Sequence, residues 1–213
     1  MAERQPKKMT VEEFFEWQQR QDKNYELVDS VPVLLPKAMT GATARHDTIT
    51  VNAILTLGNQ LRGTPCRPRT SDQSIVTSRG TRRPDVSVEC GKPEDHSMSA
   101  SDPRVVIEVH SPSVSQYDRF HKLEEYKRHP AIKVILLVDS EAARVTVWRR
   151  QEDEWDYTEV VGLEAVIDLP EIEADIPLSE LYADLTFRAA GRVLTAPPRS
   201  PLTPASACGA CSA

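Results

Sequence analysis

Residues 134–138 restrict the fold most strongly, because they are five consecutive aliphatic residues with no polar position among them. A strand with one face in water alternates apolar and polar residues, whereas an unbroken apolar run is typical of a strand covered on both faces. Residues 144–148 do alternate, and they predict a neighbouring strand with one solvent-exposed face. The rest of the chain must therefore supply layers that cover a sheet.

Two other segments have the spacing of helices that would form such layers. Apolar residues recur on one helical face over residues 43–62 and again over residues 117–129. Between these helices lie three β-rich runs, at residues 73–76, 85–88 and 104–109. The order of helix, three strands, helix, strand and strand predicts the α/β class, with a mixed central β-sheet flanked by helices.

The two ends of the chain differ from this central part. Residues 25–35 have a hairpin pattern in which Pro32 is suited only to an edge strand. From residue 189 onward the sequence has little to bury, and its prolines oppose regular structure. We expect three regions, which are a flexible N-terminus over 1–8, a single domain over 9–187 and a disordered tail over 188–213.

The composition argues against several classes of protein. No apolar run approaches the roughly 18 residues of a membrane-spanning helix, and the N-terminus lacks the apolar stretch of a signal peptide. Four cysteines in 213 residues make no dense disulfide framework, so we expect a reduced, cytoplasmic protein without a membrane partner. The net charge of −6 argues against a protein that coats nucleic acid, because such proteins are basic.

The charge is unevenly distributed along the chain. Residues 151–185 hold twelve acidic side chains and no Lys or Arg, so the remainder carries +6. Residues 62–83 hold six arginines and one acid, a local charge of +5. These arginines would draw a polyanion toward an acidic site, or they form a solubilising loop. The candidate contacts with nucleic acid are Arg69, Arg79, Arg82 and Arg83.

Two carboxylates stand in predicted strands among Val and Ile residues. Asp85 begins one strand, and Glu108 lies inside the next, 23 residues later. Burial of a carboxylate costs free energy unless a positive charge pairs with it, and a divalent cation bound by carboxylate, carbonyl and water oxygens would supply that charge. The alternative is that Glu108 faces solvent on an edge strand and Asp85 caps a turn.

The helix predicted over residues 117–129 adds a cation to this pair. Asp118, Lys122 and Tyr126 recur every four residues, and therefore share one helix face. A lysine among carboxylates could position a water molecule or stabilise a charged phosphate. The alternative is an ordinary Asp–Lys pair one helical turn apart.

Several short fragments occur together in a fixed order over residues 9–185. They include Tyr25-Glu26-Leu27-Val28-Asp29, His46, Ser71-Asp72, Arg83-Pro84-Asp85-Val86, Val106-Ile107-Glu108-Val109, Lys122-Leu123-Glu124-Glu125-Tyr126 and Leu137-Val138-Asp139. Their ordered combination resembles the Uma2-type family, a bacterial restriction-endonuclease-like family of the PD-(D/E)XK nuclease superfamily.

The resemblance implies a restriction-endonuclease-like core with a metal site. Asp85 and Glu108 would hold Mg²⁺ or Mn²⁺ together with the carbonyl of Val109. The lysine of the superfamily signature is replaced here by His110, and the family moves its role to the following helix, which makes Lys122 the catalytic candidate together with the two acids. Further family positions near the site are Glu26, His46, Asp72, His110 and Tyr126.

The implied activity is metal-dependent hydrolysis of phosphodiester bonds, with DNA as the nucleic-acid partner and a homodimer left open. For His46 the alternative is a structural histidine at a helix start. Ser30 stands where the family usually has a glycine, which alters a turn. The change at His110 and the acidic segment 151–185 also allow a different function, that of a catalytically inactive nuclease fold used for binding or assembly.

Overall fold

A six-stranded sheet forms the centre of the computed structural model, which describes residues 8–35, 42–92, 95–110, 116–189 and 192–195. Its strand order is β10-β9-β8-β7-β6-β3, and β7 and β8 run parallel while the other neighbours are antiparallel. The strands are β3 (Cys66–Thr70), β6 (Val86–Cys90), β7 (Pro103–His110), β8 (Val134–Asp139), β9 (Arg144–Gln151) and β10 (Glu154–Val161). The predicted fold class, a mixed sheet flanked by helices, is confirmed.

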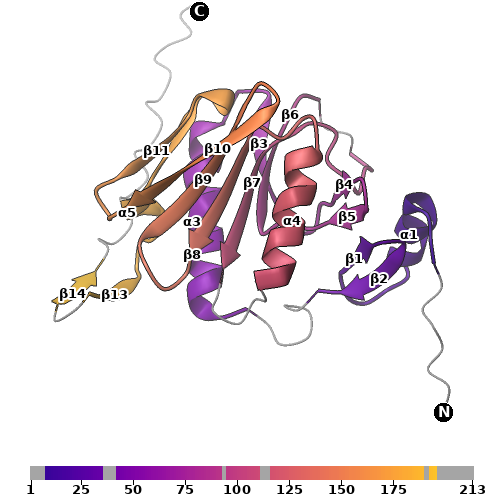
Figure 1. Cartoon of the computed structure of the whole chain (residues 1–213), viewed down its shortest axis with the longest axis horizontal. Helices are drawn as coiled ribbons and strands as arrows, with labels where there is room; N and C mark the ends of the chain where they lie inside the picture. The colour runs from indigo at the N-terminus through magenta and orange to yellow at the C-terminus, as the bar shows by residue number, and fades with distance from the viewer. Residues whose placement is uncertain (1–7, 36–41, 93–94, 111–115, 190–191, 196–213) are drawn as a thin grey trace, which may run out of the picture.

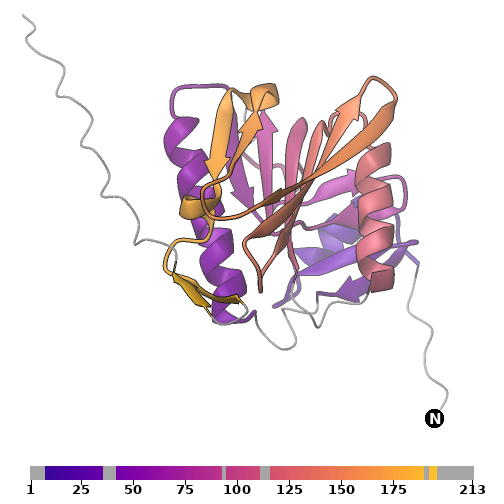
Figure 2. The same cartoon turned by 60° about the vertical axis from the view of Figure 1, so that its left-hand side comes forward.

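The two long helices lie on opposite faces of this sheet, as Figures 1 and 2 show for α3 (Ala44–Gln60) and α4 (Gln116–Arg128). Side chains of β8 alternate between these layers. Leu136 packs in the same core cluster as Leu57 of α3, whereas Ile135 packs with Leu123 of α4. The apolar run 134–138 is therefore a strand that is covered on both faces, as predicted.

A smaller four-stranded sheet lies beside α4 (Figure 1) and has the order β2-β1-β5-β4. Its elements, with the helix before them, are α1 (Val11–Gln18), β1 (Tyr25–Val28), β2 (Val31–Leu34), β4 (Ile75–Thr77) and β5 (Gly80–Arg82). β2, which contains Pro32, is at the edge as expected. The run at 73–76 contributes to this sheet rather than to the central one, a placement that local periodicity does not reveal.

The acidic segment 151–185 belongs to the fold itself. It forms edge strand β10, the hairpin of β11 (Val166–Leu169) and β12 (Ala174–Pro177), and the short helix α5 (Leu178–Leu181). Apolar residues of the hairpin and of α5, such as Ile176 and Leu181, join the same core cluster as α3. The segment thus covers part of α3, on the side seen in Figure 2.

Regular structure continues past residue 187, where the sequence predicted a tail without it. β13 (Thr186–Ala189) and β14 (Arg192–Thr195) form an antiparallel hairpin. Residues 1–7 and 196–213 lie outside the described residues. In the part of the chain that is described, no helix combines the length and the apolar character needed to cross a membrane.

One feature of the cysteines differs from the sequence prediction. Cys66 and Cys90, expected to be reduced, form a disulfide between register partners of β3 and β6. The pairing escaped prediction because β3, a strand that contains two arginines and a proline, has no apolar alternation. Cys208 and Cys211 lie outside the described residues.

Candidate active site

The two predicted metal-binding carboxylates meet at one end of the central sheet. β6 and β7 are antiparallel with Val86 opposite Ile107, so Asp85, which directly precedes β6, stands opposite Glu108. Both side chains are buried. The alternative of a solvent-facing Glu108 on an edge strand is excluded, because β7 lies between β6 and β8.

Asp85 is oriented by groups from two different elements. Its Oδ2 accepts a hydrogen bond of 2.8 Å from the backbone N–H of Val109, and the Nε2 of His46 lies 3.2 Å from the same oxygen. His46 is in the first turn of α3, where its backbone N–H donates to the capping side chain of Thr43. Its imidazole therefore reaches the site, as the family position implies.

The backbone of β7 directs one further oxygen toward Asp85. The N–H of Ser140 donates to the carbonyl of His110, which therefore points toward β8. Successive strand residues point their backbone groups to opposite sides, so the carbonyl of Val109 points to the side of Asp85, as its N–H does. The two carboxylates and this carbonyl face a common region.

Glu108 occupies an apolar environment with one hydrogen-bond donor. The hydroxyl of Tyr126 on α4 donates to its Oε1 over 2.8 Å, and both side chains are buried. Burial, together with the negative charge of Asp85, raises the pKa of Glu108 to about 7 against the opposing effect of Lys122. Glu108 therefore lies in a position where its ionised form is disfavoured.

Lys122 reaches the site from α4 but binds a third carboxylate. Its Nζ donates to Oε1 of Glu26 on β1 over 3.0 Å. Burial opposes ionisation of Glu26, but Lys122, Arg82 and the backbone N–H of Arg83 together hold its pKa below the ordinary value. Lys122 therefore does more than pair with a neighbour on its own helix, since it links α4 to β1.

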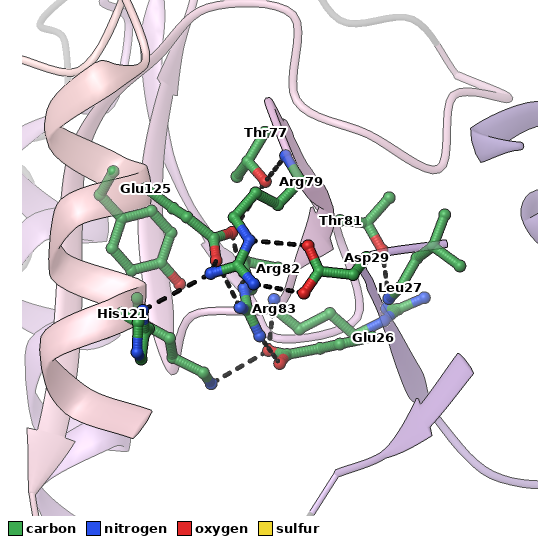
Figure 3. A network of polar contacts seen from close by, with 12 residues as sticks. Glu26, Leu27, Asp29, Thr77, Arg79, Thr81, Arg82, Arg83, His121 and Glu125 are labelled. Atoms are coloured by element: carbon green, nitrogen blue, oxygen red, sulfur yellow. Dashed lines mark hydrogen bonds and ion pairs between the residues drawn. The ribbon is translucent and has the colours of Figure 1, made fainter. Parts of the chain in front are cut away.

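The arginines next to Asp85 do not have the predicted surface role. Arg82 and Arg83 are only 3% and 2% exposed. Arg82 donates to Glu125 and Glu26 (Figure 3), and the side chain of Arg83 donates to the backbone carbonyls of Tyr25, Ser71 and Asp72. The prediction that these two residues contact nucleic acid is wrong, because their guanidinium groups are enclosed and bound inside the protein.

The remaining candidates from the arginine-rich region are more accessible. The side chains of Arg69 and Arg79 are 32% and 34% exposed, and they pair with Glu89 and Asp29. Asp72, a predicted neighbour of the site, accepts a hydrogen bond of 2.9 Å from the amide of Asn24. That contact, together with its backbone carbonyl on Arg83, gives Asp72 a role in shaping the loop after β3.

His110, at the position of the signature lysine, lines a cavity beside the carboxylates. Burial lowers the pKa of His110 to about 4, and the charges of Arg119 and Lys122 act in the same direction. The cavity measures about 450 Å³, and its lining residues are His110, Arg119, Leu137, Asp139, Glu141, Arg144, Thr146 and Glu159. Apart from His110, none of them was predicted as a site residue, because they come together through strand register, the connection of β8 to β9 and the packing of α4 on the sheet.

The donor set of the site suits a hard divalent cation. Two buried carboxylates and a backbone carbonyl are oxygen ligands of the kind that Mg²⁺ and Mn²⁺ take, with water completing the set. The raised pKa of Glu108, which burial causes first of all, is the kind of shift that a bound cation would reverse. Over the described residues, no three His, Cys, Asp or Glu side chains are grouped as metal ligands, so the carbonyl and water oxygens are needed.

Comparison with known proteins gives three findings. A family model described as "Putative restriction endonuclease" matches residues 11–179. Two uncharacterised proteins of Synechocystis sp. are similar to this chain. The first is 29% identical over 185 residues, which cover 84% of this chain and 94% of the relative. The second is 26% identical over 166 residues, which cover 75% of this chain and 92% of the relative. A crystal structure from Anabaena variabilis, described as a "putative nuclease belonging to DUF820", superposes with a TM-score of 0.64 at 16% identity, covering 82% of this chain and 97% of that one, which shows a shared fold.

Proposed function

We propose, from the premise that the chain belongs to the Uma2 family of restriction-endonuclease-like proteins, that it hydrolyses phosphodiester bonds in DNA with the help of a divalent metal ion. The observation that supports this most strongly is the meeting of Asp85 and Glu108 at one end of the sheet, with the pKa of Glu108 raised to about 7. Two buried acids on neighbouring strands, one of them with a pKa raised by burial and by the charge of the other, are an arrangement that favours the binding of a cation.

The residues that would hold the ion are Asp85, Glu108 and the carbonyl of Val109. When bound, Mg²⁺ or Mn²⁺ lowers the pKa of a coordinated water and offsets the charge of a scissile phosphate. His46 and the N–H of Val109 fix the orientation of the Asp85 carboxylate, and the hydroxyl of Tyr126 fixes that of Glu108. These contacts give the two ligands a defined geometry before a substrate arrives.

Lys122 supplies the positive charge for the phosphate. Its side chain is mostly buried and hydrogen-bonded to Glu26, so its rotamer is restricted. An ammonium group held in a low-dielectric site stabilises the extra negative charge of a phosphoryl transition state more strongly than one in water. We place Arg69 and Arg79, which are partly exposed, as contacts with the DNA backbone outside this site.

The test is cleavage of a supercoiled plasmid in the presence of Mg²⁺ or Mn²⁺. We expect the wild type to nick the plasmid, and Asp85→Asn and Glu108→Gln to lose this activity, because each removes a charged ligand at little change in size. Asp102→Asn is the matched control, since Asp102 is a partly exposed acid just before β7, at the opposite end of that strand from the site.

Two results would contradict the proposal. Equal cleavage by the wild type and both site variants would show that the cleavage does not depend on Asp85 and Glu108. A wild type that binds Mn²⁺ in calorimetry with neither affinity for DNA nor cleavage would also refute it. Binding of DNA without metal binding or cleavage would favour the alternative, a nuclease fold used only for binding.

A further inference from the structure

The cavity beside His110 continues directly from the candidate metal site. Strand register places Glu108 opposite Leu137, Leu137 opposite Thr146, and Thr146 opposite Glu159. This row crosses four neighbouring strands, β7 to β10, and side chains of register partners share a face of the sheet. Because adjacent strands are about 4.8 Å apart, the cavity begins one strand away from Glu108.

Arg119 brings the cavity into contact with α4 as well. It lies three residues before Lys122 on that helix, so the two side chains lie on the same side of it. His110 in turn feels the charges of Asp85 and Lys122 from the site and those of Arg119 and Asp139 from the cavity. The site and the cavity are therefore two parts of one continuous surface.

The charges that line this cavity largely compensate one another. Arg144 forms an ion pair of 2.7 Å with Asp139, and Glu141 lies 3.7 Å from the Nε of Arg45, just outside the cavity. Arg119 and Glu159 contribute one further charge of each sign to the lining. A phosphate group would meet several carboxylates here, so the lining is poorly suited to hold an anion.

A nucleobase fits this lining better than a phosphate does. A base carries no net charge and presents hydrogen-bond donors and acceptors side by side, which match carboxylate, guanidinium and hydroxyl groups in one cavity. Leu137, which is only partly buried, offers an apolar surface for its ring. The volume of about 450 Å³ lies within the range of small-molecule sites.

We propose that the cavity binds one unpaired base of the substrate, that of a nucleotide next to the scissile phosphate. This rests on the proposed function for the placement of the phosphate at Asp85, Glu108 and Lys122. A base paired in a duplex cannot enter such a cavity, so the substrate class is DNA that is single-stranded, or whose nucleotide is extruded, at the point of cleavage.

The experiment measures base binding without any cleavage. Metal-free protein labelled with ¹⁵N is titrated with 2′-deoxynucleosides, and in parallel with inorganic phosphate, while amide chemical shifts are followed. We expect at least one nucleoside to give saturable shifts confined to the parts of α4 and of β7 to β10 that line the cavity. We expect phosphate alone to leave those signals unchanged.

Two variants fill the cavity from different strands. Thr146→Trp does so from β9, and Glu159→Trp does so from edge strand β10, where Glu159 is exposed and a large side chain needs no rearrangement of the core. Gln151→Trp, an exposed position at the far end of β9, is the control. Loss of the nucleoside shifts in both filled variants, with the control binding as wild type, is the expected result.

These outcomes are independent of the outcome of the cleavage assay. The Asp85→Asn variant, in which cleavage is expected to be lost, should bind the nucleoside as the wild type does. The inference is overturned if no nucleoside gives saturable shifts, if phosphate alone reproduces them, or if both filled variants bind like the wild type. Any of these results would leave the proposed function, metal-dependent cleavage of DNA, unaffected. Base binding by a chain that does not cleave DNA would refute only the proposed function.

Discussion

Arg82 of β5 and Glu125 of α4 form a buried ion pair with two hydrogen bonds, 2.9 Å from Nε and 2.5 Å from Nη2. The same guanidinium donates to Glu26, the partner of Lys122, over 3.1 Å (Figure 3). One arginine thus ties the small sheet to α4 and holds the carboxylate that orients the candidate catalytic lysine.

We expect Arg82→Met to lower the free energy of unfolding by about 3–5 kcal/mol, because it leaves Glu125 buried without its ion-pair partner and removes one of the two cations that bind Glu26. Urea unfolding followed by circular dichroism measures this loss. Arg79→Met is the matched control, since Arg79 is near the surface and its pair with Asp29 should contribute less than about 1 kcal/mol. Equal losses in the two variants would show that the buried network does not stabilise the fold.

The protonation of Glu108 should make the stability of the metal-free protein depend on pH. Burial raises its pKa to about 7 in the folded state, from 4.5 in the unfolded chain, so the folded state holds the proton more tightly. The resulting stabilisation is complete below about pH 4.5 and is lost as the pH rises through 7. We therefore expect the wild type to lose stability relative to Glu108→Gln between pH 5 and 8.

The comparison with Glu108→Gln isolates this one group. His110, whose lowered pKa destabilises the folded state in acid, is present in both proteins and cancels in the difference. Urea unfolding at four pH values gives the two stability curves. Parallel curves from pH 5 to 8 would mean that the fold does not raise the pKa of Glu108, and would remove one support for a cation site at this pair of acids.

The sequence predicted those features that local patterns determine. The apolar run at 134–138 specified a strand covered on both faces, and that strand requires helices on two sides of a sheet. Asp85 and Glu108 were recognisable because a carboxylate among Val and Ile residues is costly without a partner. The 23 residues that separate them include the connection between two antiparallel strands, β6 and β7, and this pairing brings the two acids together.

The features that the sequence did not reveal depend on contacts between distant segments. A run of arginines has the same composition whether its side chains are exposed or buried, and the partners of Arg82 are 56 and 43 residues away. The cavity residues Leu137, Thr146 and Glu159 are brought into one row by strand register alone. The strand β3 and the hairpin of β11 and β12 were missed because they are short and mixed in polarity.

The turn between β1 and β2 contains two residues in a backbone conformation that is unfavourable for residues other than glycine. Asp29 and Ser30 both have positive φ, 49° and 69°, as a two-residue hairpin turn of type I′ requires. Glycine adopts this conformation without the steric cost of a Cβ atom. We expect Ser30→Gly to stabilise the protein by about 0.5–1 kcal/mol, measured by urea unfolding, and Ser30→Ala to leave its stability nearly unchanged. A loss of stability in Ser30→Gly would show that the Ser30 side chain makes a contribution beyond the turn.

His46 tests whether Asp85 is a metal ligand without relying on catalysis. Its Nε2 lies 3.2 Å from Oδ2 of Asp85, and the imidazole therefore restricts the carboxylate to one orientation. Removing a group that orients a metal ligand typically weakens metal affinity by about 10–100-fold.

We expect His46→Ala to weaken Mn²⁺ binding by that factor in calorimetry, while His96→Ala, at an exposed position, leaves it unchanged. Because His46 lies in the first turn of α3 and is absent from the apolar core, the variant should fold. If both variants bound Mn²⁺ with wild-type affinity, the contact from His46 would contribute nothing to metal binding, and its proposed role in orienting Asp85 as a ligand would be wrong.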